Sequence, residues 1–267
     1  NAYPFRISAA TDDRPYFYHF LKWSSLSDLF AQFGNRARPF VELGSLLMVL
    51  AMIQAGFLTV LLLLFPIVVV RGWRGVSRKN MASLGYFCAI GAGYMLLEMG
   101  CMQKLVLFLG HPVYSAATVI AGFLVFSGLG SMASDIVAKR PGKAGITGAA
   151  VVALLAASSP WLLDGAIRIA MHLPDWQKFP LGMLFIAPLA FPMGIFFPLG
   201  FRHIMKTDED LAPWAWGANG FASVLATLGA PLLAMRIGFS GLAFLAAACY
   251  LSIALFWLLQ RPDTGES

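Results

Sequence analysis

Glu98 is the residue that most readily suggests chemistry, because it is a carboxylate inside a long apolar segment. It lies well inside the stretch 81–102, with Tyr94 one helical turn before it and Met102 one turn after it. An ionisable group at membrane depth is costly and marks a functional candidate by default. Two interpretations remain open. The carboxyl is either satisfied within the bundle by a hydroxyl, an amide or a proton, or it handles a proton, a cation or an amine.

Polar residues near helix ends extend this candidate site. Gln103 and Lys104 follow Glu98 in the sequence, and an ion pair between Glu98 and Lys104 is one predicted arrangement. Asn219 lies one turn inside a later apolar segment, where an amide can hydrogen-bond across helices. Packing without function is the alternative at that position.

His111 and Tyr114 lie in the turn Gly110–Tyr114 between two apolar segments. A histidine in such a turn is a candidate for proton handling, although one without a visible partner is more often a hydrogen bonder within the loop. The predicted intramembrane or helix-end polar site therefore comprises Glu98, Tyr94, Gln103, Lys104, His111, Tyr114 and Asn219.

No sequence motif assigns a reaction. The cysteines Cys88, Cys101 and Cys249 lie in apolar runs and form no CxxC pair. The four histidines are scattered, so no metal-ligand spacing stands out. Nucleotide-binding, phosphate-loop, GxSxG and HExxH patterns are likewise missing from the 267 residues. The sequence predicts no cofactor and no metal in this chain, and it leaves open whether the protein is an enzyme.

The elements that must position these residues are membrane-spanning helices. The chain is 59% hydrophobic and only 12% charged, with a mean hydropathy of +0.74. Leucines 61–64 do not alternate with polar residues, which argues against barrel strands. We predict an all-α integral membrane protein of about seven transmembrane helices. The predicted spans are 43–70, 81–102, 113–134, 144–163, 180–201, 214–235 and 242–259.

The chain divides into three predicted parts. Residues 1–40 form a polar and aromatic N-terminal segment, the end of a possible upstream soluble domain; 41–260 form the helical bundle; and 261–267 are a polar tail. Small residues in the third and sixth spans indicate close helix packing. The prolines of the fifth span indicate a bent or broken helix, as found at transporter binding sites or where packing requires a kink. Residues 236–238 indicate a tight turn.

Most of the charged residues lie in the loops between the apolar segments, where their distribution predicts the orientation of the chain. The net charge of +6 forms no basic face, so we expect a lipid bilayer as partner and no nucleic acid. Loops 71–80, 135–143 and 201–210 with the tail carry ten Lys and Arg residues, against four in the opposite loops. The positive-inside rule then predicts a cytoplasmic C-terminus. The N-terminal segment adds five basic residues to the opposite side and narrows this bias to ten against nine.

Four stretches of the chain, in order, carry a resemblance to one family. They are residues 10–20 (ATDDRPYFYHF), 93–114 (GYMLLE through Gln103 and LFLGHP to Tyr114), 191–200 (FPMG through FPLG) and 213–220 (PWAWGANG). Together these stretches resemble membrane-bound spermidine-synthase-like proteins. Such proteins join membrane helices to a Rossmann-type domain similar to aminopropyltransferases. The nucleotide-binding half has no counterpart in this sequence.

The resemblance implies that this chain is the C-terminal membrane part of such a protein, or a separate membrane partner of one. It implies anchoring of a catalytic domain, handling of its amine substrate or product, and a location in a bacterial inner membrane. Asp12, Asp13 and Arg14 are the residues expected to contact a soluble domain. A catalytic domain that uses a cytoplasmic metabolite belongs inside the cell. Seven spans with a cytoplasmic C-terminus would place residue 1 outside, so the two expectations conflict. Two other hypotheses remain: a transporter-like bundle for a small cation or amine, and a structural subunit of a larger membrane complex.

Overall fold

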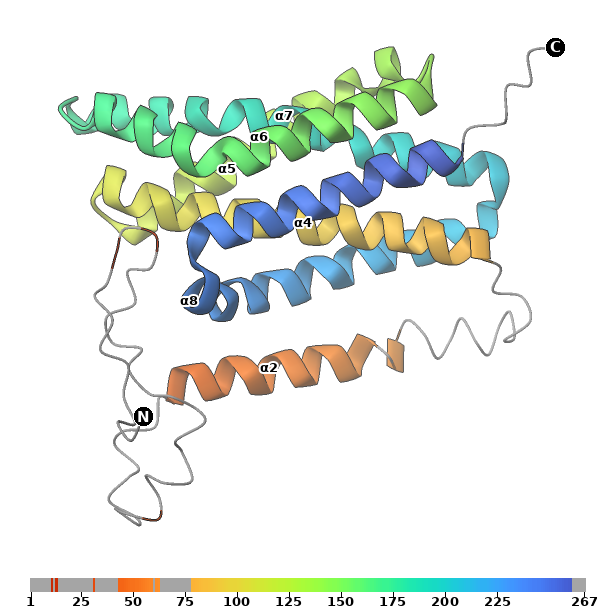
Figure 1. Ribbon diagram of the computed structural model, residues 1–267, viewed down its shortest axis with the longest axis horizontal. Coiled ribbons are helices and arrows are strands. Elements are labelled where there is room, and N and C mark those ends of the chain that lie inside the picture. The colour runs from red at the N-terminus through yellow and green to blue at the C-terminus, as the bar shows by residue number, and fades with distance from the viewer. Residues whose placement is uncertain are drawn as a thin grey trace.

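The computed structural model describes residues 11, 13, 31, 43–59, 61–62 and 78–260. The elements of the described part are α2 (Leu43–Thr59), α4 (Arg78–Leu109), α5 (Pro112–Val137), α6 (Pro141–Ala170), α7 (Asp175–Thr207), the short 3-10 helix η5 (Glu209–Leu211) and α8 (Ala212–Leu259) (Figure 1). The all-α prediction is confirmed for these residues. Most of the predicted N-terminal segment, with Asp12 and Arg14, and the tail 261–267 lie outside the described residues.

Five helices of the described residues are long and apolar enough to cross a membrane, which indicates an integral membrane protein. The predicted number of seven is therefore wrong. The first predicted span, 43–70, corresponds to α2, which has only 17 residues within the described part. The predicted spans 214–235 and 242–259 both belong to α8, a helix of 48 residues. The last two predicted spans are thus two parts of one helical element, because no polar loop separates them.

The helix α8 is a hairpin that turns at Gly238. This residue has φ 76° and ψ 177°, a non-helical conformation inside an otherwise helical run. Figure 1 shows the chain doubling back there, so that both arms lie along α4. The packing agrees, because Gly91 faces Asn219 of the first arm and Gly93 faces Tyr250 of the second. The predicted turn at 236–238 is thus confirmed.

Asp13 holds this turn from the N-terminal part of the chain. The Phe239 N–H donates to the Asp13 carbonyl oxygen at 3.1 Å. The Ser240 N–H and the Ser240 hydroxyl donate to Oδ1 of Asp13, at 2.9 and 2.8 Å. Asp13 therefore satisfies orphan donors at the start of the second arm, as an N-cap residue does, although it is more than two hundred residues away in sequence. The predicted contact of Asp13 with a soluble domain stays a prediction.

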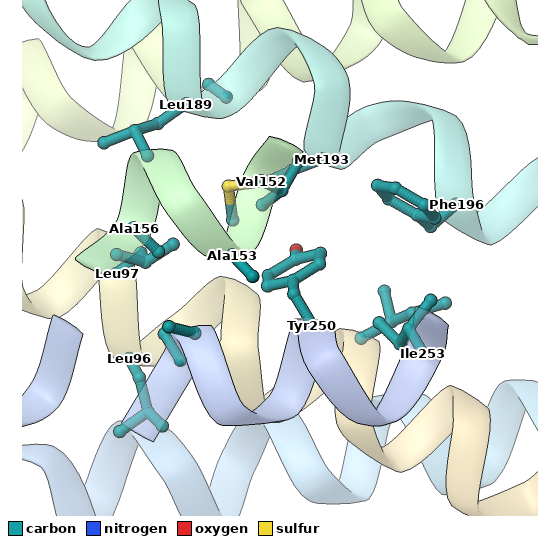
Figure 2. Packing of buried hydrophobic residues seen from close by; sticks show 14 of the residues in the cluster. Leu96, Leu97, Val152, Ala153, Ala156, Leu189, Met193, Phe196, Tyr250 and Ile253 are labelled. Atoms are coloured by element: carbon teal, nitrogen blue, oxygen red, sulfur yellow. The ribbon is translucent and has the colours of Figure 1, made fainter. Parts of the chain in front are cut away.

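The core lies where α4, α6, α7 and the second arm of α8 meet. Figure 2 shows Tyr250 reaching from α8 toward the side of the core formed by α6 and α7, among Val152, Met193 and Phe196. All four side chains are almost completely buried. The outer surface is apolar instead, with Ile169 84% exposed. Such a surface is expensive in water and compatible with lipid.

The helices α5 and α7 touch backbone to backbone at two glycines. A Cβ atom on Gly130 would overlap the Phe191 carbonyl group, and one on Gly194 would overlap the Ser127 carbonyl group. Each glycine therefore makes room for the opposite helix, as small residues do at membrane helix crossings. Gly128 has open space around its Cα, so it does not take part in this crossing.

Candidate functional site

A polar cavity of about 440 Å³ lies beside the crossing of α5 and α7, and α4 and α8 complete its walls. This volume falls within the range of roughly 300–1,000 Å³ that small-molecule sites occupy. Its polar side chains come from three helices: Tyr94, Ser127, Ser131, Asn219 and Ser223. Hydroxyls and an amide at membrane depth give the cavity acceptors for hydrogen bonds that lipid cannot provide.

The polar groups of the cavity are held by bonds between helices. The Tyr94 hydroxyl and Ser127 Oγ lie 3.2 Å apart and join α4 to α5. The Asn219 Nδ2 donates to the Phe87 carbonyl at 3.2 Å and joins α8 to α4. The Ser223 hydroxyl donates to the Asn219 carbonyl at 2.9 Å within α8. The cavity is thus a preorganised site whose walls cannot move independently.

The helix α7 adds a backbone acceptor to the cavity. It remains helical from Asp175 to Thr207 although four prolines lie inside it, so the expected break is not present. Proline has no N–H, and Pro198 therefore cannot donate to the Gly194 carbonyl one turn earlier. Both residues line the cavity. The Gly194 carbonyl therefore lacks its usual donor four residues later, which leaves it able to accept from a ligand.

Glu98 lies on the same face of α4 as Gly91, Tyr94 and Met95, which line the cavity. It is one turn beyond Tyr94 and is not itself part of the lining. Glu98 is only 6% exposed, and its side chain makes no hydrogen bond or ion pair with any residue that the structure describes. A buried carboxylate without a partner is costly, so it requires a proton or a bound cation.

Lys104 forms an ion pair with a different residue from the predicted one. Its Nζ lies 2.8 Å from Oδ1 of Asp164 in α6, and the Lys104 side chain is only 7% exposed. The predicted pair of Glu98 with Lys104 is wrong. Six residues at about 100° per residue place the two side chains some 120° apart around α4, on different faces. The Lys104–Asp164 ion pair connects α4 to α6, and Lys104 therefore does not neutralise Glu98.

The other predicted residues lie away from the cavity. His111 is the N-cap of α5, where its Nδ1 accepts the Val113 N–H at 3.2 Å. Its ring lies 5.4 Å from that of Tyr114, which is about half exposed. Gln103 is partly buried and contributes nothing to the cavity lining. Of the seven predicted residues, the structure brings Tyr94 and Asn219 together in the cavity, with Glu98 on its α4 face.

The three serines of the cavity are the residues that sequence reasoning missed as site residues. Ser131 belongs to the small residues of the third predicted span, which indicate packing, and neither Ser127 nor Ser223 stands out in the sequence. Ser127 and Ser131 lie one turn apart on the same face of an apolar segment, but helix packing produces the same spacing, so the sequence contains no signal specific to a cavity. Within the described residues no group of three His, Cys, Asp or Glu side chains is placed to hold a metal ion.

Comparison of the chain with known protein families, with curated proteins and with solved structures finds no match to any of them. The resemblance to spermidine-synthase-like proteins therefore rests on the four sequence stretches alone.

Proposed function

We propose that this chain is a membrane domain that binds a small amine in the cavity between α4, α5, α7 and α8. One observation carries the proposal: Glu98 is a nearly buried carboxylate that has no partner among the described residues and shares a helix face with the cavity. An ammonium group supplies the counter-charge that Glu98 requires. In an environment of low dielectric constant this attraction is much stronger than in water.

The acceptors of the cavity suit the same ligand. An ammonium carries three N–H donors and no acceptor. The hydroxyls of Ser127 and Ser131 and the Gly194 carbonyl, which lacks its usual donor four residues later, can each accept from it. Tyr94 is one turn from Glu98 on α4, and its hydroxyl lies 3.2 Å from Ser127 Oγ. An amine with several nitrogens would reach from the serines to Glu98.

The resemblance to spermidine-synthase-like proteins supports a polyamine as that amine. On this proposal the chain is the membrane part of such a protein in a bacterial inner membrane, and a catalytic Rossmann-type domain or another membrane subunit is its partner. The connection between α5 and α6, which includes Lys139 and Arg140, lies at the same end of the bundle as the C-terminal end of α8 in Figure 1. The positive-inside rule supports a cytoplasmic location for that end.

The first test is binding of radiolabelled spermidine to the chain in phosphatidylcholine nanodiscs. Replacing Glu98 by glutamine removes the negative charge and keeps the shape, so we expect at least a tenfold loss of affinity, since one desolvated charge pair is worth roughly 1.5–3 kcal/mol. Glu209→Gln, at an exposed position of η5, is the matched control and should bind like the wild type. Equal binding by the wild type and by Glu98→Gln would remove the proposed role of Glu98.

Transport of the same amine is a second candidate, favoured by the proline-rich helix α7 along the cavity. Reconstituted liposomes distinguish it from binding alone. If the bundle transports the amine, liposomes with the wild-type chain should take up more labelled spermidine than protein-free liposomes. Liposomes with Glu98→Gln should take up no more than protein-free liposomes. Binding in nanodiscs without accumulation in liposomes would leave the binding-domain proposal and discard the transporter.

A further inference from the structure

A second and larger hollow lies on the other side of α4. This groove has a volume of about 980 Å³ and is bounded by α2, α4 and the first arm of α8. Figure 1 shows α2 alongside that arm and apart from the remaining helices. The lining is almost entirely apolar, with Met52 and Ile53 from α2, Ala89 and Ala92 from α4, and Leu225 and Ala226 from α8.

The groove has the length of a lipid chain. Along α8 its lining runs from Phe221 to Arg236, a distance of roughly 22 Å at about 1.5 Å per residue. One leaflet of a bilayer has a hydrocarbon depth of about 15 Å, half of the roughly 30 Å core. An extended acyl chain therefore fits along the groove. The small side chains of Ala89, Ala92 and Ala226 provide its width.

Among the described residues that line the groove, Arg236 is the only charged one. It is exposed, and it forms no ion pair or hydrogen bond with any described residue. Asp13 lies at the nearby turn, but its Oδ1 already accepts from Ser240. Because Arg236 comes two residues before Gly238, where α8 turns back at the end of the bundle, its guanidinium lies near the edge of the apolar layer.

We propose that the groove binds a phospholipid, with an acyl chain between α2 and α8 and the phosphate on Arg236. A guanidinium matches the geometry of a phosphate and binds it through two parallel N–H groups. A second helix in the groove would bury Arg236 against apolar side chains, whereas a phospholipid supplies both the apolar chain and the counter-charge. This lipid site is separated from the amine cavity by α4 and does not depend on the proposed function.

Native mass spectrometry of the chain in mild detergent with added phosphatidylglycerol tests the phosphate contact. We expect a one-to-one adduct that resists activation. Arg236→Gln should weaken it about fivefold, the effect of one cation near a lipid phosphate. Diacylglycerol with the same chains lacks the phosphate, so it should bind the wild type no better than it binds Arg236→Gln. Arg168→Gln, an exposed arginine on α6 outside the groove, is the matched control and should retain the adduct. Equal losses in both variants, or no wild-type adduct, would overturn the proposal.

Ala226→Phe tests the position of the chain, because it places a ring inside the groove. It should remove the adduct, whereas Ala150→Phe, at an exposed position of α6, should not. Monodisperse elution and a helical circular dichroism spectrum equal to that of the wild type show that Ala226→Phe is folded. An adduct that survives in a folded Ala226→Phe variant would overturn the groove as the site. A cross-linked dimer through Ile53→Cys in bilayers would likewise overturn it, with a second copy as the occupant.

Discussion

Replacing Gly194 by alanine is expected to lower the free energy of unfolding by about 2–3 kcal/mol, the cost of overpacking a rigid contact. The added Cβ would overlap the carbonyl group of Ser127. A backbone atom cannot rotate away as a side chain can, so α5 and α7 must separate along their whole crossing. Unfolding followed by circular dichroism during titration of dodecyl maltoside micelles with sodium dodecyl sulfate measures the change.

The reciprocal contact and a neighbouring glycine provide the controls. Gly130→Ala should cost a similar amount, because its Cβ meets the Phe191 carbonyl group in the same crossing. Gly128→Ala should be neutral or should stabilise by up to about 1 kcal/mol, since nothing surrounds Gly128 and alanine favours a helix. A Gly194→Ala variant as stable as Gly128→Ala would show that the two helices do not cross at this place.

The same crossing positions the cavity, so the variant also tests the site. Gly194 and Ser127 both line the cavity, and their backbones are in contact. Separating α5 from α7 would move Ser127 away from the Tyr94 hydroxyl. We therefore expect Gly194→Ala to weaken spermidine binding and to lower the free energy of unfolding. Gly128→Ala should lower neither.

The hydrophobic pattern predicts which segments are helical, but not how they connect. The predicted span 144–163 becomes α6, which runs from Pro141 to Ala170, because the helix continues beyond its apolar window, through Pro160, until a turn ends it. The number of helices is less predictable. A single glycine reverses α8, and its stabilising contact comes from Asp13, a residue that no local pattern connects to it.

The candidate site was predictable where it depends on one helix. Tyr94 and Glu98 share a face of α4 because of their spacing, and the structure keeps them there. The partner of Lys104 depends on how α4 lies against α6, and no spacing contains that information. The serines were missed because a small hydroxyl in an apolar helix has the same pattern whether it packs or lines a cavity.

Gly238→Ala is expected to lower the free energy of unfolding by about 3 kcal/mol. A backbone near φ 76° and ψ 177° belongs to a region that only glycine occupies readily, at a cost of about 1–3 kcal/mol for other residues. The new Cβ would also overlap the carboxylate of Asp13, which adds the loss of a cap worth about 1 kcal/mol. Gly220→Ala, in open space on the first arm, should cost nothing.

Asp13→Ala separates these two contributions. Alone it should cost about 1 kcal/mol, whereas Asp13→Asn, which keeps the Oδ1 acceptor for Ser240, should cost much less. In the Gly238→Ala background the loss of Asp13 should cost less than it does alone, because the overlap with Cβ has already displaced the carboxylate. Additive losses would mean that Asp13 does not contact Gly238. An Asp13→Ala variant as stable as the wild type would show instead that the N-terminal part of the chain does not stabilise the hairpin.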